Sequence, residues 1–320
     1  MRSIDKLLVT GASGQIGSEL VLKLREIYGK DNVVASDIRK TELDETGPFE
    51  NLDVTNRSKI DEVVKNYKID AIIHLAALLS ASGELRPNDA WNVNINGLYN
   101  VLEVAKSRNL TRVFHPSSIA VFGPETPREN TPQECVLRPR TMYGITKVAG
   151  ELLGNYYYYK FGVDVRGARF PGIISNKTPP TGGTTDYAVE IFYDALRYGK
   201  YNCFLRKDTY LPMLYMPDLL NGVVKLLEAD LSLLKHHADF NMGALSFCPS
   251  ELATELRKHQ PDFEIIYKPD YRQAIADSWP KSVDDSTSRT EWGWKPEYDL
   301  PTMVKDMYET LKKKKEIGKL

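Results

Sequence analysis

The first half of the chain alternates short apolar runs with longer amphipathic stretches, and this alternation limits the available folds more than any other feature of the sequence. Runs rich in β-branched residues predict strands, and the stretches between them have helical spacing. The predicted strands span residues 6–10, 32–36, 71–75, 112–116 and 164–168, and the predicted helices span 15–28, 58–67, 89–107 and 143–161. Helices of this length can connect parallel strands, so the pattern predicts an α/β fold with a doubly wound parallel sheet.

A turn with three glycines follows the first predicted strand directly, and a helical pattern begins after it. Glycine permits a tight turn, the approach of bare backbone to a diphosphate, and close packing of helix on strand. The amino end of the helix would then face the phosphates. We therefore predict a Rossmann-type dinucleotide site at Gly11, Gly14, Gln15, Ile16 and Gly17. A plain strand-to-helix turn is the alternative.

The second predicted strand is followed by Asp37, which lies twenty residues after Gly17. A carboxylate here accepts hydrogen bonds from ribose hydroxyls and repels a 2′-phosphate, so it favours NAD as the cofactor. Arg39 is close by, and a guanidinium there would accommodate NADP instead. Asp53 and Val54 follow a third short apolar stretch. At that point the carboxylate would cap an adenine amino group or be a surface group at a strand end.

The pattern of strand and helix signals changes after Pro171. Residues 178–185 are rich in turn-forming residues, and shorter helical patterns follow them. We expect an NAD-binding Rossmann domain over residues 1–175. Residues 176–320 would form mainly a smaller C-terminal α/β substrate domain, with some segments returning to the Rossmann sheet. A junction above the carboxyl ends of parallel strands is a preferred place for a ligand.

Composition favours a small-molecule enzyme. Lys and Arg number 42 against 43 Asp and Glu, which gives no reason to expect nucleic acid or an anionic membrane as a partner. The apolar runs are shorter than the roughly 20 residues that span a bilayer. Cys135, Cys203 and Cys248 are widely separated, which predicts reduced thiols and no metal site. We expect a cytoplasmic protein; a mitochondrial matrix location is equally compatible if a presequence has been removed.

Tyr143 and Lys147 are the candidate catalytic pair. A spacing of four at the start of a long predicted helix places both side chains on one face. An alcohol donates hydride only when its proton leaves, and a free phenol with a pKa of ~10 is a poor base near neutrality. A neighbouring ammonium favours the phenolate, and Lys147 would also hold the nicotinamide ribose.

The surroundings of this pair resemble the extended short-chain dehydrogenase/reductase family. The resemblance is carried by Ser117-Ser118-Ile119-Ala120-Val121-Phe122-Gly123, upstream of Tyr143 and Lys147. It implies that Ser118 is the third catalytic residue. It also implies that the segment from His74 to Ala77, and with it Leu75, Ala76 and Ala77, lies beside the cofactor, and that Asn94 lies beside the active site.

Blocks in the second half are similar to the L-threonine 3-dehydrogenases of the short-chain type. They are Phe170-Pro-Gly-Ile-Ile-Ser175, the segment from Gly182 to Ile191, Leu211-Pro-Met-Leu-Tyr-Met-Pro-Asp218 and Asp277-Ser-Trp279-Pro280. This resemblance implies a small amino acid as the substrate, bound by Ser80, Thr185, Asp186 and Trp279 together with Ser118 and Tyr143. Asp186 would meet the substrate ammonium or cap the helix that follows it.

The implied reaction is the NAD-dependent oxidation of the L-threonine 3-hydroxyl to 2-amino-3-oxobutyrate, which loses carbon dioxide spontaneously to give aminoacetone. A nucleotide-sugar epimerase or dehydratase of the same fold is the first alternative. Nucleotide-sugar relatives commonly have an asparagine three residues after the arginine that matches Arg169, whereas this chain has Gly172. A non-catalytic NAD-binding regulator is the second alternative.

The resemblance further implies a homodimer that pairs through the predicted helices 89–107 and 143–161. The second of these helices contains the aromatic run 156–159, which would pack in the core or on the dimer surface.

Overall fold

The computed structural model describes residues 3–39, 42–180 and 183–320. Its centre is a six-stranded parallel sheet with the strand order β3-β2-β1-β4-β5-β7. These strands are β1 (Leu7–Thr10), β2 (Val33–Asp37), β3 (Phe49–Asn51), β4 (Ala71–His74), β5 (Arg112–Phe114) and β7 (Val165–Arg166). The chain runs outward from β1 through β2 to β3 and then returns to the other side of β1 at β4, so the strand order reverses beside β1, and a ligand crevice forms at such a reversal.

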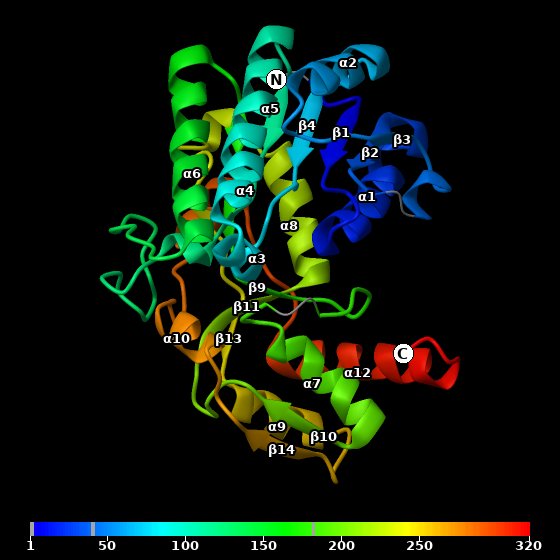
Figure 1. Ribbon diagram of the computed structural model, residues 1–320, viewed down its shortest axis with the longest axis vertical. Helices are drawn as coiled ribbons and strands as arrows, with labels where there is room; N and C mark the ends of the chain where they lie inside the picture. Colours follow the sequence, from blue (N-terminus) through cyan, green and yellow to red (C-terminus); the bar gives the residue numbers. More distant parts are fainter. Residues whose placement is uncertain (1–2, 40–41, 181–182) are drawn as a thin grey trace.

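Helices cover both faces of this sheet (Figure 1). Leu7 and Val9 of β1 share a core with α1 (Gln15–Tyr28) and α8 (Met216–Glu228). Leu8 points to the opposite face and packs with α2 (Arg57–Tyr67) and α5 (Gly97–Arg108). The alternation along β1 therefore serves two separate cores, as expected of a parallel sheet buried on both sides.

The second half of the chain builds a smaller unit below the sheet in Figure 1. Two short sheets lie in this unit, β13-β11-β9 and β10-β14, and β9 joins it from the first half of the chain. A third short sheet, β12-β8-β6, contributes Phe240 and Phe170 to the core that α1 and α8 share. The strands are β6 (Ser117–Ser118), β8 (Ala168–Phe170), β9 (Gly172–Ile174), β10 (Lys200–Cys203), β11 (Leu211–Tyr215), β12 (Phe240–Asn241), β13 (Leu245–Phe247) and β14 (Glu264–Tyr267).

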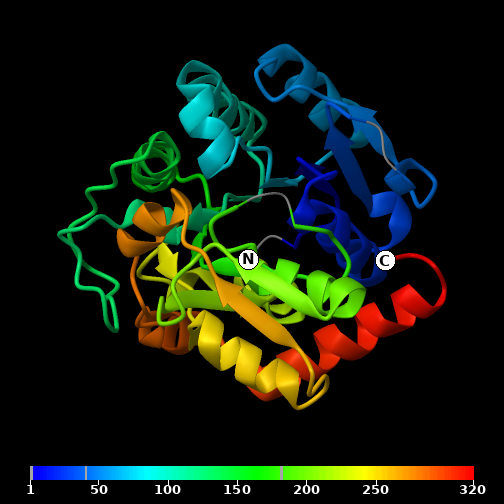
Figure 2. The same cartoon turned by 60° about the horizontal axis from the view of Figure 1, so that its bottom comes forward.

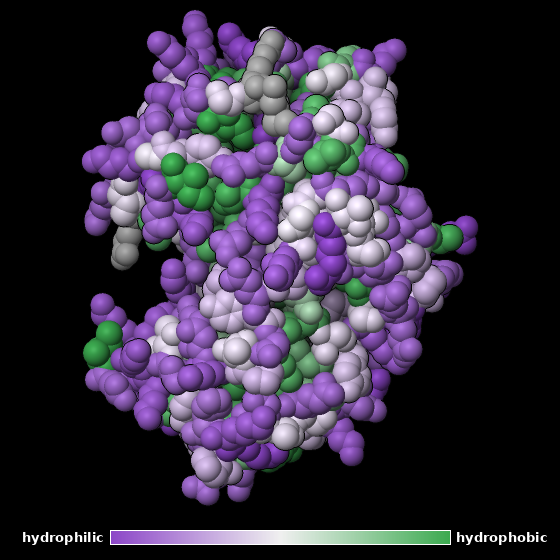
Figure 3. Space-filling view, turned by 180° about the vertical axis from the view of Figure 1, so that it is seen from behind, coloured by the Kyte–Doolittle hydropathy of each residue, from purple (hydrophilic) through white to green (hydrophobic). Residues whose placement is uncertain are grey.

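One apolar core holds this smaller unit together, and the C-terminal helix lies against it (Figure 2). Helix α12 (Leu300–Glu316) packs on α7 (Tyr187–Tyr198) and α9 (Pro249–Arg257). The short helix α10 (Arg272–Asp277) also belongs to the unit, with Ala276 in its core. Helix α11 (Ser286–Trp292) instead contacts β12 and places Trp292 in the core that α1 and α8 share. Seen from behind, the molecular surface is mostly hydrophilic and is hollowed at one edge between its upper and lower parts (Figure 3).

The predicted fold class is confirmed, and three local differences have physical reasons. The predicted helix 89–107 is three elements, α4 (Pro87–Trp91), a π-helical turn (Asn92–Asn96) and α5. The predicted strand 112–116 ends at Phe114, and Ser117–Ser118 pairs with β8 in another sheet. Strand β3 was not predicted as a strand, because a three-residue edge strand carries little pattern.

The division into domains at residue 175 stays a prediction. Helix α8, from the second half of the chain, packs on α1 of the first half. Strand β9, from the first half, pairs with β11 of the second. Within the described parts of the chain, no helix is long and apolar enough to cross a membrane. The same parts hold no group of three or more His, Cys, Asp or Glu residues arranged for a metal ion.

Candidate functional site

The glycine turn after β1 leaves no space for larger residues. Gly11 has a φ of +70°, and a Cβ there would lie 2.5 Å from the backbone nitrogen of Ala76. A Cβ on Gly17 would clash with the carbonyl oxygen of Gly11. Helix α1 begins at Gln15 without a side-chain cap among the described residues, so its first amides are open to a ligand. The turn thus fits a diphosphate at the helix amino end.

Asp37 ends β2 and lies against this turn. Its carboxylate accepts hydrogen bonds from the amides of Ser13, at 3.0 Å, and Arg39, at 3.1 Å. The Arg39 side chain is 72% exposed, with its Nε 3.8 Å from the Asp37 carboxylate. An ion pair this open to water is weak, so Arg39 leaves the negative charge of Asp37 largely in place. The choice of NAD over NADP stays a prediction.

Asp53 and Val54 have mainly local contacts. The Asp53 carboxylate accepts hydrogen bonds from the amide and the hydroxyl of Thr55, at 2.9 and 2.8 Å. Val54 packs on Gly97 of α5, where an added Cβ would lie 2.8 Å from its Cγ2. These contacts shape the turn before α2. The predicted role of Asp53 toward adenine is not tested by them.

A cavity of about 410 Å³ lies between the glycine turn, the start of α6 (Met142–Phe161) and the segment before α7. Most predicted site residues line it, namely Gly11, Gly14, Gln15, Ile16, Gly17, Leu75, Ala77, Ser80, Ser118, Tyr143, Lys147, Thr185, Asp186 and Trp279. Six predicted residues lie outside its lining: Asp37, Arg39, Asp53, Val54, Ala76 and Asn94. A cavity of this size is typical of a small-molecule site.

Further lining residues were not predicted. They are mostly chain neighbours of predicted residues, and they are Leu79, Ser82, Pro116, Ser117, Ile119, Phe170, Pro171, Gly172, Ile173, Gly183 and Thr184. For most of them, the sequence signal that could have identified them is that they adjoin a residue of a predicted motif. Ser82 carried no motif signal, and its place in the first turn of α3 (Ser80–Leu85), two residues after Ser80, brings it to the cavity.

Helix α6 places Tyr143 in its first turn because Thr141 caps the helix and accepts a hydrogen bond from the Gly144 amide at 3.1 Å. Lys147 follows one turn later, with its Nζ 5.5 Å from the centre of the Tyr143 ring. This ammonium donates to the carbonyl oxygen of Pro116 at 2.6 Å. The predicted pair therefore shares one face of the helix, directed at the strand that ends in Ser118.

The hydroxyl of Ser118 has the geometry of a donor to a ligand. Its oxygen accepts a hydrogen bond from the Ala120 amide at 3.2 Å, which leaves its own proton free to be donated. A hydrogen bond with Ser118 also lowers the pKa of Tyr143, although burial is the larger effect and raises that pKa to about 12. Two hydroxyls thus converge on one point of the cavity.

Burial is the main cause of the pKa shifts of Lys147 and of the neighbouring His74. Burial lowers the pKa of the Lys147 ammonium to about 8, and the carboxylate of Glu151 opposes this shift. Burial and the Lys147 charge lower the pKa of His74 to about 3, so this imidazole is neutral. It shares a 2.9 Å hydrogen bond with the Thr10 hydroxyl. His74 therefore supports the strand ends at the site and has no proton to donate as an imidazolium.

Asn94 lies outside the cavity and braces its wall. Its side-chain oxygen accepts from the Leu78 amide at 2.8 Å, and its nitrogen donates to the Leu78 carbonyl at 3.0 Å. The same nitrogen donates to the Thr146 hydroxyl at 3.1 Å, which ties the loop after β4 to α6. Asn94 thus holds the segment that leads to Ser80 beside the catalytic helix.

The predicted substrate residues come from separate segments. Thr185 packs against Gly172, and Asp186 accepts the Gly183 amide at 2.9 Å. Asp186 precedes α7 but forms no side-chain cap to it, so the alternative of a helix cap is not observed. Trp279 is buried at the cavity wall, and its carbonyl accepts from Arg128 at 3.3 Å. Residues 181 and 182 of the predicted turn-rich segment lie outside the described residues.

A parallel sheet with its order reversed beside β1, a glycine turn fitted to a diphosphate, and a Tyr-Lys pair facing a serine hydroxyl define a dinucleotide-dependent enzyme of the Rossmann type. Residues 7–243 match the model of the NAD dependent epimerase/dehydratase family. The chain belongs to this family.

Its relatives cover almost the whole chain. An uncharacterized epimerase/dehydratase of Staphylococcus haemolyticus (strain JCSC1435) is 51% identical over 317 residues, which are 98% of this chain and 99% of that protein. The X-ray structure of L-threonine dehydrogenase from Clostridium difficile is 53% identical with a TM-score of 0.96, covering 98% of this chain and 99% of that one. The family predicted from the sequence is confirmed.

A monomeric L-threonine 3-dehydrogenase from a metagenome is also similar, with 48% identity and a TM-score of 0.93 over 96% of this chain and 99% of that one. Because this relative is described as monomeric, the family likeness does not fix the oligomeric state. The homodimer stays a prediction.

Proposed function

We propose that this enzyme oxidises the 3-hydroxyl of L-threonine with NAD as the hydride acceptor. The products would be 2-amino-3-oxobutyrate, NADH and a proton, and the β-keto acid would then lose carbon dioxide spontaneously to give aminoacetone. The observation that carries the proposal is the meeting of the Ser118 and Tyr143 hydroxyls beside Lys147, in a cavity that Thr185 and Asp186 also line. Relatives that are half identical and named L-threonine dehydrogenases support the choice of substrate.

In the proposed mechanism, the threonine 3-hydroxyl lies between Ser118 and Tyr143. The phenolate of Tyr143 takes the hydroxyl proton as the hydride leaves the same carbon, so a C–H and an O–H bond break while a carbonyl forms. Ser118 donates a hydrogen bond to the substrate oxygen, keeps its own proton, and holds that oxygen in place. Lys147 favours the phenolate by its positive charge, which acts over a short distance in a site where the ammonium is buried.

We further propose that the glycine turn and the amino end of α1 hold the NAD diphosphate. Asp37 would accept hydrogen bonds from the adenosine ribose hydroxyls, and the Lys147 ammonium would donate to the nicotinamide ribose. The packing of Gly11 on Ala76 supports this, because it keeps side-chain atoms away from the turn. On the substrate side, Asp186 would meet the ammonium, and Ser80, Thr185 and Trp279 would close around the rest of the amino acid. Asp53 would cap the adenine amino group beside Val54, and Ala76 and Asn94 would lie beside the cofactor.

Gly172 favours threonine over a nucleotide sugar. An asparagine there would have to occupy the space that Thr185 fills, since even a Cβ would lie 2.7 Å from the Cβ of Thr185. The chain thus lacks the amide that nucleotide-sugar relatives commonly direct at a sugar diphosphate. In its place the Cβ and methyl group of Thr185 lie against Gly172, and Thr185 lines the cavity. The smaller space that remains suits a small zwitterion.

The test compares L-threonine, L-serine, L-allo-threonine and UDP-galactose side by side with NAD. We expect NADH from L-threonine at millimolar concentration and no UDP-glucose from UDP-galactose. Thr185→Ala should raise the KM for threonine or lower kcat while NADH affinity stays at the wild-type value. Epimerisation of UDP-galactose without NADH formation from L-threonine would overturn the proposal and leave the cofactor fold untouched.

A further inference from the structure

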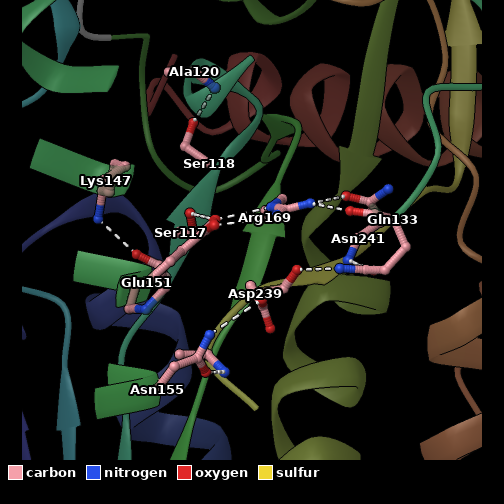
Figure 4. A network of polar contacts seen from close by, with 12 residues as sticks. Ser117, Ser118, Ala120, Gln133, Lys147, Glu151, Asn155, Arg169, Asp239 and Asn241 are labelled. Atoms are coloured by element: carbon pink, nitrogen blue, oxygen red, sulfur yellow. Dashed lines mark hydrogen bonds and ion pairs between the residues drawn. The ribbon is translucent and has the colours of Figure 1, made fainter. Parts of the chain in front are cut away.

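A third polar residue follows the catalytic pair along α6. Tyr143, Lys147 and Glu151 are spaced by four, so they form a row on one face of the helix. Lys147 donates to the Pro116 carbonyl at 2.6 Å, and Glu151 accepts from the Ser117 hydroxyl at 2.5 Å. The helix is therefore fixed at two points to the short segment that ends in the reacting serine (Figure 4).

Glu151 is a buried carboxylate with a bidentate partner. Its side chain is 3% exposed, and the guanidinium of Arg169 donates one hydrogen bond to each of its oxygens, both at 2.9 Å. Arg169 also donates to the carbonyl of Gln133 at 2.9 Å and to the side-chain oxygen of Asn241 at 3.1 Å. Figure 4 shows these partners around Arg169. Burial raises the pKa of Glu151, and the hydrogen bonds from Arg169 and Ser117 oppose that rise.

The other titratable groups around Lys147 are uncharged or act on other residues, so Glu151 is the anion that acts on the Lys147 ammonium. His74 and His115 stack with ring centres 5.6 Å apart, and burial lowers the pKa of both, so both are neutral. Burial keeps Tyr143 protonated in the absence of ligand. Asp239, on the far side of Glu151, acts on Glu151 and Arg169. Within the described residues, Glu151 is the group whose charge stabilises the Lys147 ammonium.

We infer that Glu151 and Ser117 are positioning residues for the reaction under "Proposed function", on which this inference rests. Glu151 keeps the Lys147 ammonium charged. Ser117, held by Glu151, fixes the strand end so that the Ser118 hydroxyl meets Tyr143. Arg169 lets the carboxylate remain ionised in a site closed to water, because an unpaired buried charge would be too costly to keep.

Two variants separate the electrostatic role from the geometric role. Glu151→Gln keeps the shape and a carbonyl oxygen for Ser117 but removes the negative charge. The Lys147 proton should then leave at lower pH, since Arg169 remains as a positive charge nearby. Ser117→Ala keeps the charge and removes the hydrogen bond that holds the strand end. It should lower kcat without moving the pH dependence.

Asp164→Asn is the matched control. Asp164 is another buried carboxylate, paired with Arg112 at 2.8 Å and Arg166 at 2.9 Å, and it lies outside the lining of the cavity. Its replacement removes one negative charge from a similar buried ion cluster. Any general effect of breaking such a cluster will therefore appear in this control as well.

The experiment titrates the full-length protein with NADH, by cofactor fluorescence, from about pH 6 to about pH 10. Wild-type affinity should weaken as Lys147 loses its proton. The midpoint for Glu151→Gln should lie about one pH unit lower, the size expected of a lost charge one helical turn away that Arg169 partly compensates. Asp164→Asn and Ser117→Ala should keep the wild-type midpoint, while Ser117→Ala lowers kcat with L-threonine by roughly ten- to a hundredfold.

An unchanged or raised midpoint for Glu151→Gln would overturn the inference, as would an equal displacement in Asp164→Asn. If Glu151→Gln does not fold, Glu151→Asp keeps the charge and must keep the wild-type midpoint; a displaced midpoint in that variant would overturn the electrostatic role. NADH binding requires no threonine. A wild type with a normal NADH titration and no threonine oxidation would therefore refute the proposed substrate and not the role of Glu151.

Discussion

Gly172 and Thr185 lie so close that a Cβ atom at position 172 would stand 2.7 Å from the Cβ of Thr185 and 2.5 Å from the sulfur of Met213. Real Cβ contacts do not reach such distances, so strand β9 or the segment before α7 must move when the glycine is replaced. Gly172 is the residue that argues against a nucleotide sugar, and Thr185 is proposed to bind the amino acid. Their contact therefore links the absence of the asparagine to the substrate site.

Gly172→Ala should therefore lower kcat/KM for L-threonine by roughly tenfold or more, because a small displacement of a positioning group is costly in rate. NADH affinity should stay at the wild-type value, since the glycine turn is untouched. Steady-state kinetics and NADH fluorescence measure the two effects. Gly83→Ala is the control, because its added Cβ would meet the Cβ atoms of Ala90 at 3.6 Å and Tyr143 at 3.9 Å, both ordinary contacts that require no displacement. Wild-type kcat/KM in Gly172→Ala would show that Thr185 has no part in substrate binding.

Tyr143→Phe should leave NADH affinity nearly intact while kcat falls by roughly two to four orders of magnitude, the range lost with a positioned general base. The variant removes one oxygen and keeps the ring beside Lys147. Equilibrium titration with NADH measures the affinity, and steady-state kinetics measures kcat. Turnover near the wild-type level would mean that another group takes the proton.

Lys147→Ala should weaken NADH binding and lower turnover together. One ammonium is proposed to hold the nicotinamide ribose and to stabilise the phenolate, so both readouts depend on it. The same two measurements apply, with Lys160→Ala as a control on the exposed end of the same helix. A loss of turnover with unchanged NADH affinity would separate the lysine from the cofactor.

The wild-type rate should rise with pH and level off near pH 8. The reaction requires Tyr143 without its proton and Lys147 with its proton; burial raises the pKa of Tyr143 to about 12 and lowers the pKa of Lys147 to about 8. Below the Lys147 value, each rise in pH increases the fraction of phenolate. Above it, loss of the ammonium offsets that gain. The pH profile of kcat/KM for threonine is the measurement, and a rate that falls from about pH 6 to about pH 8 would contradict this assignment.

Local features of the sequence predicted much of this site. The start of α1 follows from its glycines, and the catalytic helix follows from the spacing of Tyr143 and Lys147 at the start of a long helical pattern. Such signals lie within a few residues of each other. These local signals predicted the two ends of the cavity, which are the cofactor turn at one end and the catalytic helix at the other.

Contacts between distant segments could not be predicted in this way. Ser117–Ser118 was expected to follow a strand of the main sheet, whereas it pairs with β8 in a separate sheet. The bidentate contact of Arg169 with Glu151 joins residues 18 apart on different elements, and no periodicity marks it. Asn94, implied to lie beside the active site, braces the loop after β4 from outside the cavity. These arrangements depend on how elements pack, which the local pattern does not encode.

Transfer of the C3 hydrogen of threonine to NAD is the step that most directly tests the proposed reaction. L-threonine carrying deuterium at C3 would be incubated with the protein and NAD, and the cofactor analysed by mass spectrometry. We predict NADH with one deuterium per molecule, formed together with aminoacetone in equal amount, because Tyr143 takes only the hydroxyl proton. NADH without deuterium, or no NADH at all while UDP-galactose is epimerised, would contradict the account.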